Sequence, residues 1–225
     1  MLSQIGRYYA QPRMSSVIYN GRTPSLFHSR ESKDHLITTV GRLWDAGKNA
    51  ALLSQDELPW PVCVVGSDKP PATENSFQKQ QECCPGVQLL PQQNEEQLRE
   101  LLGGTAIYAA VSRYEPFGLA PVEAALSGCA VLASDIESFR ELWDDAAIFF
   151  RNNDPASLRQ ALNALTEDSN FRQSCAKRAY DHARKWFAAD RMLHQYVDFY
   201  RTLMQQVERP AFFHDGNMTC KEISA

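Results

Sequence analysis

One stretch, residues 106–134, constrains the fold of this chain more than any other. It starts with an uncharged apolar run over 106–111 and ends with another over 130–134, and both are typical of strands buried on both faces of a sheet. Residues 119–127 are mostly good helix formers, and Gly128 suits a helix C-terminal stop. Strand, polar loop, helix and strand in this order predict a parallel crossover unit. Ligands of such folds bind where strands end and helices begin.

The loop of this unit combines an anion site with two carboxylates. Gly118 lets the backbone approach a ligand closely, and the helix that begins at Leu119 has free amide hydrogens in its first turn. Glu115 lies in the loop and Glu123 within the first two helical turns, so both can face one cleft. Because two carboxylates repel a bare phosphate, we interpret them as acceptors for the hydroxyl groups of a ribose and a sugar. The loop therefore predicts a nucleotide-sugar site.

A second loop, residues 41–49, follows a strand predicted at 35–40. Gly41 permits a tight turn, Arg42 offers a planar fork of donors, and Lys48 places a point charge near a helix start. The alternative is that both cations are solvated loop charges, which is the usual state of such residues. Their position at the carboxyl end of a strand favours the functional interpretation.

The motifs together resemble a known signature. Residues 115–119 read Glu-Pro-Phe-Gly-Leu and are followed by Glu123-Ala124, as in retaining, GT-B fold glycosyltransferases of the glycogen-synthase-like group. The basic loop at 41–48 and the string at 15–21 match further motifs of that family. The resemblance covers about residues 15–205 and implies the C-terminal, donor-binding domain of a group 1, or family 4, enzyme. It also implies that most of the N-terminal domain, which holds the acceptor, is missing from this sequence.

The resemblance implies roles for individual residues. Arg42 and Lys48 would hold the donor diphosphate and act with Glu115, which would contact the donor sugar. Glu123 would hold the ribose hydroxyls, and Leu90 would contact the base. No metal and no cofactor beyond the donor substrate are expected, and the chain has no Asp-x-Asp pair. The expected donor-binding set is Gly41, Arg42, Lys48, Leu90, Glu115, Phe117, Gly118, Leu119 and Glu123.

The predicted architecture is α/β: a Rossmann-like parallel sheet of about six strands with helices on both faces, and C-terminal helices that cross back. We expect an N-terminal-domain remnant and linker at 1–30, the nucleotide-sugar-binding domain at 31–188, a crossover helix at 189–207 and a flexible tail at 208–225. The crossover helix carries an apolar stripe that we expect to be packed. The stripe consists of Met192, Tyr196, Phe199, Leu203 and Val207.

Smaller elements complete this prediction. Helices are expected from Asn49 to Gln55, at 74–83 and at 94–102, the last with Asn94 as its N-cap. Gly103-Gly104 would end that helix. Leu89, in a strand over 86–90, is expected in the core.

Composition excludes several classes of protein. A net charge of −4 without a basic stripe argues against a nucleic-acid binder. No apolar run reaches the roughly 18 residues of a transmembrane helix, and residues 1–14 lack the apolar core of a secretory signal. The six cysteines follow no metal-ligand spacing and form no dense disulfide framework, so a reducing cytoplasm is the expected location.

We therefore expect transfer of a glycosyl group from a nucleoside diphosphate sugar with retention of configuration, or the donor-binding half of such an enzyme. Two alternatives stay open: a non-catalytic nucleotide-sugar binding or regulatory module, and a relative that epimerises UDP-sugars. The expected partners are the donor, an acceptor (a sugar, a lipid-linked glycan or a small molecule), and a separate chain that supplies the N-terminal domain.

Overall fold

The computed structural model of the chain describes residues 6–8, 14–55, 57–67 and 86–207. Its strands are β1 (Asp34–Val40), β2 (Val62–Val65), β3 (Val87–Leu90), β4 (Thr105–Ala110), β5 (Ala130–Ser134) and β6 (Ile148–Phe150). Its helices are η1 (Pro24–Leu26), η2 (Ala50–Ser54), α2 (Glu95–Gly104), α3 (Leu119–Leu126), α4 (Glu137–Trp143), α5 (Pro155–Glu167), α6 (Ser169–Trp186) and α7 (Ala189–Val207), of which η1 and η2 are 3-10 helices.

The strands form one six-stranded sheet in the order β3-β2-β1-β4-β5-β6. Every neighbouring pair is parallel. This is the strand order of the Rossmann fold, in which the chain turns outward from a central strand in both directions. The predicted α/β class is therefore confirmed. The two central strands are β1 and β4, so the loops after them lie next to each other at the carboxyl edge.

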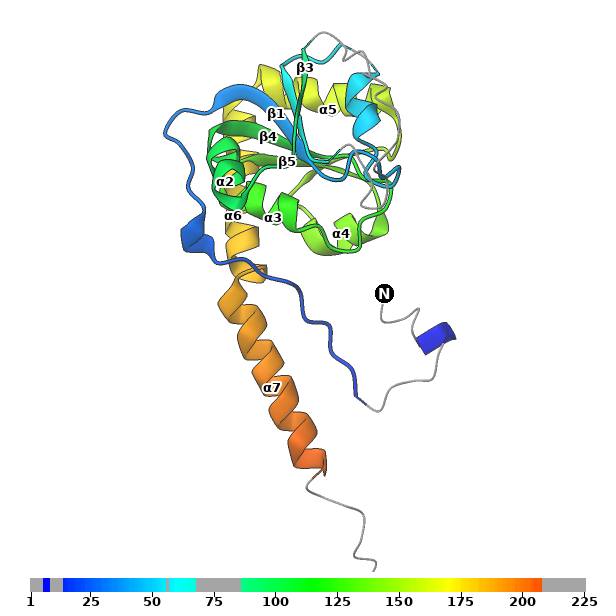
Figure 1. Cartoon of the computed structure of the whole chain (residues 1–225), viewed down its shortest axis with the longest axis vertical. Coiled ribbons are helices and arrows are strands. Elements are labelled where there is room, and N and C mark those ends of the chain that lie inside the picture. Colours follow the sequence, from blue (N-terminus) through cyan, green and yellow to red (C-terminus); the bar gives the residue numbers. More distant parts are fainter. Residues whose placement is uncertain (1–5, 9–13, 56, 68–85, 208–225) are drawn as a thin grey trace, which may run out of the picture. The chain divides into compact units, whose positions relative to one another are not determined.

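Side chains alternate along the central strands and so contribute to two cores. Tyr108 and Ala110 of β4 belong to a cluster with residues of α3, α4 and α6. Ile107 and Ala109 belong to a second cluster with residues of η2 and α5. Figure 1 shows α3 and α4 on one side of the strands and α5 on the other. Helices thus cover both faces, as the continuous apolar runs predict.

Helix starts follow the predicted capping signals. Asn94 accepts a hydrogen bond from the Gln97 amide at 2.8 Å, and the Gln97 side chain accepts one from the Asn94 amide. Asp154 caps α5 in the same way, through the Ser157 amide at 2.9 Å. The helix α2 ends at this glycine pair, as predicted, but it includes both glycines and ends at Gly104 rather than at Leu102. A Cβ on Gly103 would lie 2.9 Å from the His28 carbonyl oxygen, so this glycine serves close packing against the linker.

Three other predicted details need correction or fall outside the description. Leu89 is 44% exposed rather than core, because β3 is the edge strand of the described sheet. The helix expected from Asn49 to Gln55 is the 3-10 helix η2. The helix expected at 74–83 lies outside the described residues.

The chain divides into two units, one spanning Tyr19–Met192 and one made of residues 1–18 and 193–225. In the second unit, the part of α7 beyond Met192 exposes four large apolar side chains, of which only Tyr196 belongs to the predicted stripe. The stripe residues Met192, Phe199 and Leu203 are half-buried, so the stripe is only partly packed. An amphipathic pattern predicts an apolar face but not what covers it. The exposed residues are Leu193, Tyr196, Tyr200 and Met204. None of the helices in the described part of the chain could cross a membrane by length and hydropathy.

Replacing Trp143 with alanine should lower the free energy of unfolding by about 3–5 kcal/mol, because a large side chain would leave a cavity. Trp143 is 0% exposed and its ring packs 5.5 Å from the ring of Phe187. The matched control is Trp186→Ala, which removes a tryptophan that is 37% exposed and should cost clearly less than Trp143→Ala. Urea denaturation measures both, and equal losses would contradict the assignment of Trp143 to the core.

Candidate functional site

Two loops at the carboxyl edge of the sheet are hydrogen-bonded to each other. The Gly47 carbonyl, in the loop after β1, accepts from the amides of Arg113 at 2.8 Å and Tyr114 at 3.4 Å, in the loop after β4. The buried Asn49 side chain donates to the Val111 carbonyl at 3.3 Å. Asn49 has a left-handed backbone, with φ 53°, a conformation that asparagine adopts more readily than most residues. The two predicted functional loops are therefore held in one fixed arrangement.

Beside this joint the ends of β1 and β2 come into direct contact. Gly66 has φ +152°, and a Cβ there would lie 1.7 Å from the Gly41 carbonyl oxygen. The Gly41 amide donates to the Val65 carbonyl at 2.9 Å. The half-buried Leu90 contributes its carbonyl, which accepts from the Gly66 amide at 3.0 Å.

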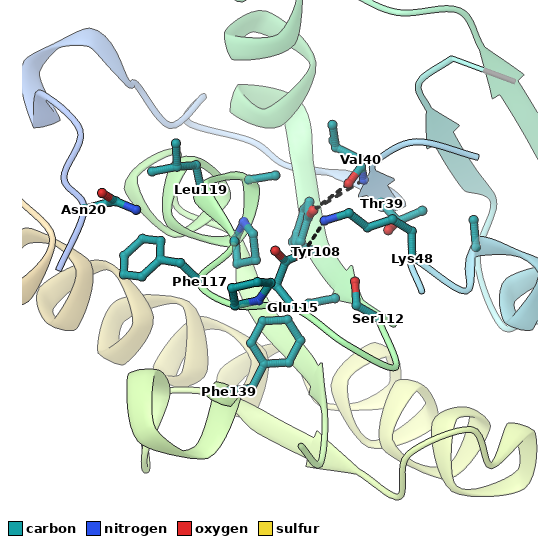
Figure 2. Close-up of a pocket in the computed structure, with 17 residues that line it drawn as sticks. Asn20, Thr39, Val40, Lys48, Tyr108, Ser112, Glu115, Phe117, Leu119 and Phe139 are labelled. Carbon is teal, nitrogen blue, oxygen red and sulfur yellow. Dashed lines mark hydrogen bonds and ion pairs between the residues drawn. The ribbon is translucent and has the colours of Figure 1, made fainter. Parts of the chain in front are cut away.

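The largest group of predicted site residues meets at one cavity of about 320 Å³. Figure 2 shows Lys48 reaching across it towards Glu115, and the two side chains form an ion pair. Both are mostly shielded from solvent, which limits screening of the pair. The predicted residues that line this first cavity are Gly41, Lys48, Glu115, Phe117, Gly118 and Leu119.

Four polar side chains in this cavity were not predicted as site residues. The Tyr108 hydroxyl donates to the Val40 carbonyl at 3.5 Å, and burial raises its pKa, so it stays neutral. Thr39 lies near the end of β1, Ser112 follows β4, and Asn20 comes from the linker. Polar residues near the carboxyl ends of buried strands were a usable signal for Thr39 and Ser112.

A second cavity of about 710 Å³ adjoins the first and shares Gly41 and Lys48 with it. Arg42 lines it, with its guanidinium 2.7 Å from Asp45 and 5.2 Å from the Trp44 ring centre. The other oxygen of Asp45 accepts from the Gly47 amide at 2.9 Å. Asp45 therefore closes the turn and holds Arg42 at the same time.

The first turn of α3 places backbone amides at the border of both cavities. Gly118 is the N-cap, with φ 80° and no side-chain cap, so first-turn amides of α3 are left without a side-chain acceptor. Leu119 and Ala120 line the first cavity, and Ala120 also lines the second. The Ser138 hydroxyl donates to the Glu115 carbonyl at 2.6 Å and ties the loop to α4.

Two predicted residues lie away from these cavities. Leu90 lines neither of them. Glu123 lines a third cavity of about 190 Å³, where Arg22 donates to its Oε1 from Nε at 2.6 Å. Gln93 and Leu98 line both the second and the third cavity, so Glu123 is next to the second cavity rather than inside it.

The described residues hold no group of three or more His, Cys, Asp or Glu side chains arranged as metal ligands. The charged groups at the site are instead two cations, a helix N-terminus and carboxylates. This arrangement can bind an anion and hydroxyl groups at the same time.

Comparison with known proteins gives a consistent assignment. The family model described as Glycosyl transferases group 1 matches residues 28–182. The O-antigen chain mannosyltransferase RfbU of Salmonella typhimurium is 24% identical over 187 residues, covering 79% of this chain and 53% of that protein. The D-inositol 3-phosphate glycosyltransferase of Corynebacterium kroppenstedtii is 32% identical over 112 residues, covering 49% of this chain and 25% of that protein.

Solved structures show the same fold. Sucrose-phosphate synthase from Thermosynechococcus elongatus has a TM-score of 0.76 at 19% identity, covering 91% of this chain and 56% of that one. HepE from Anabaena, solved with UDP and with UDP-glucose, has a TM-score of 0.73 at 19% identity, covering 88% of this chain and 60% of that one. The chain thus spans little more than half the length of these proteins.

Replacing Asn49 with alanine should cost about 2–3 kcal/mol of unfolding free energy, since it loses a buried hydrogen bond and places alanine in a left-handed conformation. Asn49→Gly loses the same bond but accepts the conformation, so it should cost only about 1 kcal/mol. Chemical denaturation compares the two. A glycine variant that is no more stable than the alanine variant would show that the backbone at Asn49 is not constrained.

Proposed function

The chain belongs to the glycosyl transferases group 1 family, and from this premise we propose that it binds a nucleoside diphosphate sugar and takes part in transfer of the glycosyl group with retention of configuration. One observation carries the proposal: Arg42, Lys48 and the start of α3 border two adjoining cavities, the first of which also contains Glu115. The complexes of HepE with UDP and UDP-glucose support a nucleotide-sugar donor for a chain of this fold.

The two cavities suit the two ends of such a donor. We place the diphosphate at their shared rim, beside Gly41, Lys48 and the α3 amides. The sugar would enter the first cavity and use Glu115 as a hydroxyl acceptor. The nucleoside would enter the second, which is large enough for it and is lined by Trp44 and Gln93 among others.

Glycosyl transfer needs positive charge where the diphosphate leaves. The bond between the anomeric carbon and the diphosphate oxygen breaks, and its electrons leave with the diphosphate. The acceptor oxygen bonds to the anomeric carbon, and the acceptor proton passes to the departing diphosphate. Arg42, Lys48 and the α3 amides are placed to stabilise that growing negative charge. We propose that they do so without a divalent cation.

The ion pairs of the site would exchange partners on binding. Lys48 pairs with Glu115 and Arg42 with Asp45. A diphosphate between the two cations would replace these carboxylates, and the released Glu115 would then accept hydroxyl groups of the sugar. We propose that a separate chain supplies the half of the enzyme that holds the acceptor site.

At least one of UDP, ADP and GDP should bind the wild-type chain in buffer with EDTA, and Arg42→Ala should weaken that binding by about 1.5–3 kcal/mol, as for a charged hydrogen bond. The matched control is Arg30→Ala. Arg30 is also exposed and paired with acids, but it precedes β1 whereas Arg42 follows it. Isothermal titration calorimetry measures all three proteins. Well-folded protein that binds none of the nucleotides would refute the donor site, and turnover of donor with a supplied N-terminal half would exclude a purely binding role.

Replacing Gly118 with alanine should weaken binding of the nucleotide sugar, while Gly86→Ala should leave it unchanged. Both glycines have positive φ, 80° and 89°, so both variants should lose about 1–2 kcal/mol of stability. Only the Cβ at Gly118 would meet Glu115, 3.1 Å from its Cγ, whereas no residue that the structure describes lies within 4 Å of one at Gly86. Denaturation measures the stability that backbone strain removes, and calorimetry measures the affinity that displacement of Glu115 removes. Unchanged binding of the nucleotide sugar in Gly118→Ala would contradict the placement of Glu115 in the donor site.

A further inference from the structure

Glu123 is a buried carboxylate whose charge needs a partner. It is 6% exposed, and burial raises its pKa. The Arg22 guanidinium opposes this and lowers the pKa. The other groups facing it are Glu95 and Arg99 from α2, which act in opposite directions, and the neutral Tyr108 from β4. Arg22 therefore supplies the main force that keeps Glu123 ionised.

Arg22 holds one oxygen of this carboxylate with two donors. Its Nε donates to Oε1 of Glu123 at 2.6 Å, and its Nη2 forms an ion pair with the same oxygen. The second oxygen, Oε2, accepts no hydrogen bond from the residues that the structure describes. One side of the carboxylate is thus fixed, and the other has capacity for further donors.

The backbone of Arg22 is itself fixed. Its amide donates to the Phe187 carbonyl at 2.9 Å, and its carbonyl accepts from the Ala189 amide at 3.0 Å. The preceding Gly21 packs so closely that a Cβ there would lie 2.7 Å from the Ala188 carbonyl carbon. Because the backbone of Arg22 is fixed in this way, its guanidinium stays close to Glu123.

Arg99 is the other cation near this carboxylate, and it is already paired. Its Nη1 lies 3.4 Å from Glu95, one helical turn earlier in α2. The opposite charges of this pair largely cancel at Glu123. Loss of Arg22 would leave the carboxylate without a close positive charge.

We propose that Arg22 is a positioning residue of the donor site: it holds the Glu123 carboxylate as an oriented acceptor for the ribose hydroxyls of a bound nucleotide. This inference rests on the proposed function. The third cavity, which Arg22 and Glu123 line, shares Gln93 and Leu98 with the second cavity, where we place the nucleoside. A ribose at that boundary would meet the unoccupied oxygen of Glu123.

Two consequences distinguish this role from a structural one. A ribose held by Glu123 makes ribonucleotides bind more tightly than their 2′-deoxy counterparts. Because only the ionised carboxylate is a pure acceptor, this preference should be lost as the pH falls through the pKa of Glu123. Removing Arg22 raises that pKa, so the loss should occur at higher pH.

The test compares binding of UDP, ADP or GDP, whichever binds the wild-type chain, with binding of its 2′-deoxy form over a range of pH. The wild-type protein should prefer the ribonucleotide by about 10-fold, the value of one hydrogen bond to a charged group. Arg22→Met should bring the preference close to unity. Any preference that remains should be lost at a higher pH than in the wild-type protein. Arg30→Met, which removes another paired arginine of the linker, should change neither.

Circular dichroism checks whether Arg22→Met folds, since it leaves a buried carboxylate without a partner. If it does not fold, Arg22→Lys provides the test. Lysine retains the positive charge but lacks the planar fork of donors. It should keep the wild-type pH profile and lose most of the preference for ribose. A lysine variant with the full preference would overturn the role of Arg22.

The remaining outcomes separate the two proposals. Wild-type protein that binds none of the three nucleotides would refute the proposed function, and the role of Arg22 with it. Wild-type binding with an Arg22→Met variant that keeps both the preference and the pH profile would refute the role of Arg22 alone. An equal loss of affinity for the ribose and deoxyribose forms, with an unchanged pH profile, would also refute the role of Arg22. Such a result would mean that Arg22 only stabilises the fold.

Discussion

The carbonyl oxygen of Gly47 is the point on which the site depends. It accepts the amides of Arg113 and Tyr114 and so joins the loop after β1 to the loop after β4. The strand order makes this contact available, because β1 and β4 are neighbours at the centre of the sheet. Lys48 and Glu115 lie next to this joint in sequence, and their ion pair crosses the cavity beside it. Backbone hydrogen bonds, rather than the charges themselves, set the distance between cation and carboxylate.

Charge balance is the second organising feature. Each cation near the proposed donor site has an acidic partner in the structure: Arg42 has Asp45, Lys48 has Glu115 and Arg22 has Glu123. Paired side chains already have defined positions, so a ligand that replaces a partner loses less conformational entropy than one that must order free chains. Because each cation is already paired, a bound anion gains only the difference between its own interaction with the cation and that of the carboxylate it replaces. Such a site favours ligands that satisfy both members of a pair, as a sugar linked to a diphosphate does.

Much of this arrangement could be predicted from the sequence, because strand periodicity and loop composition place residues at a particular edge of a sheet. Lys48 and Glu115 were found in this way. What the pattern does not contain is the direction of a side chain within that edge. Glu115 lies in the loop before α3, whereas Glu123 lies within α3. The Glu123 side chain lines a different cavity, together with Arg22 from a distant part of the chain. Its exact surroundings depend on packing between α2, α3 and the linker, which no local pattern encodes.

The contact between Gly66 and Gly41 has a consequence for variation. Main-chain atoms alone form the contact between the ends of β1 and β2, because position 66 has no space for a side chain. The shape of this contact therefore does not depend on side-chain identity, and substitutions cannot change it gradually. Trp44, Gln92 and Gln93 line the same cavity with side chains. Substitutions at side-chain positions such as these three would change the lining of this cavity while the main-chain contact stays the same.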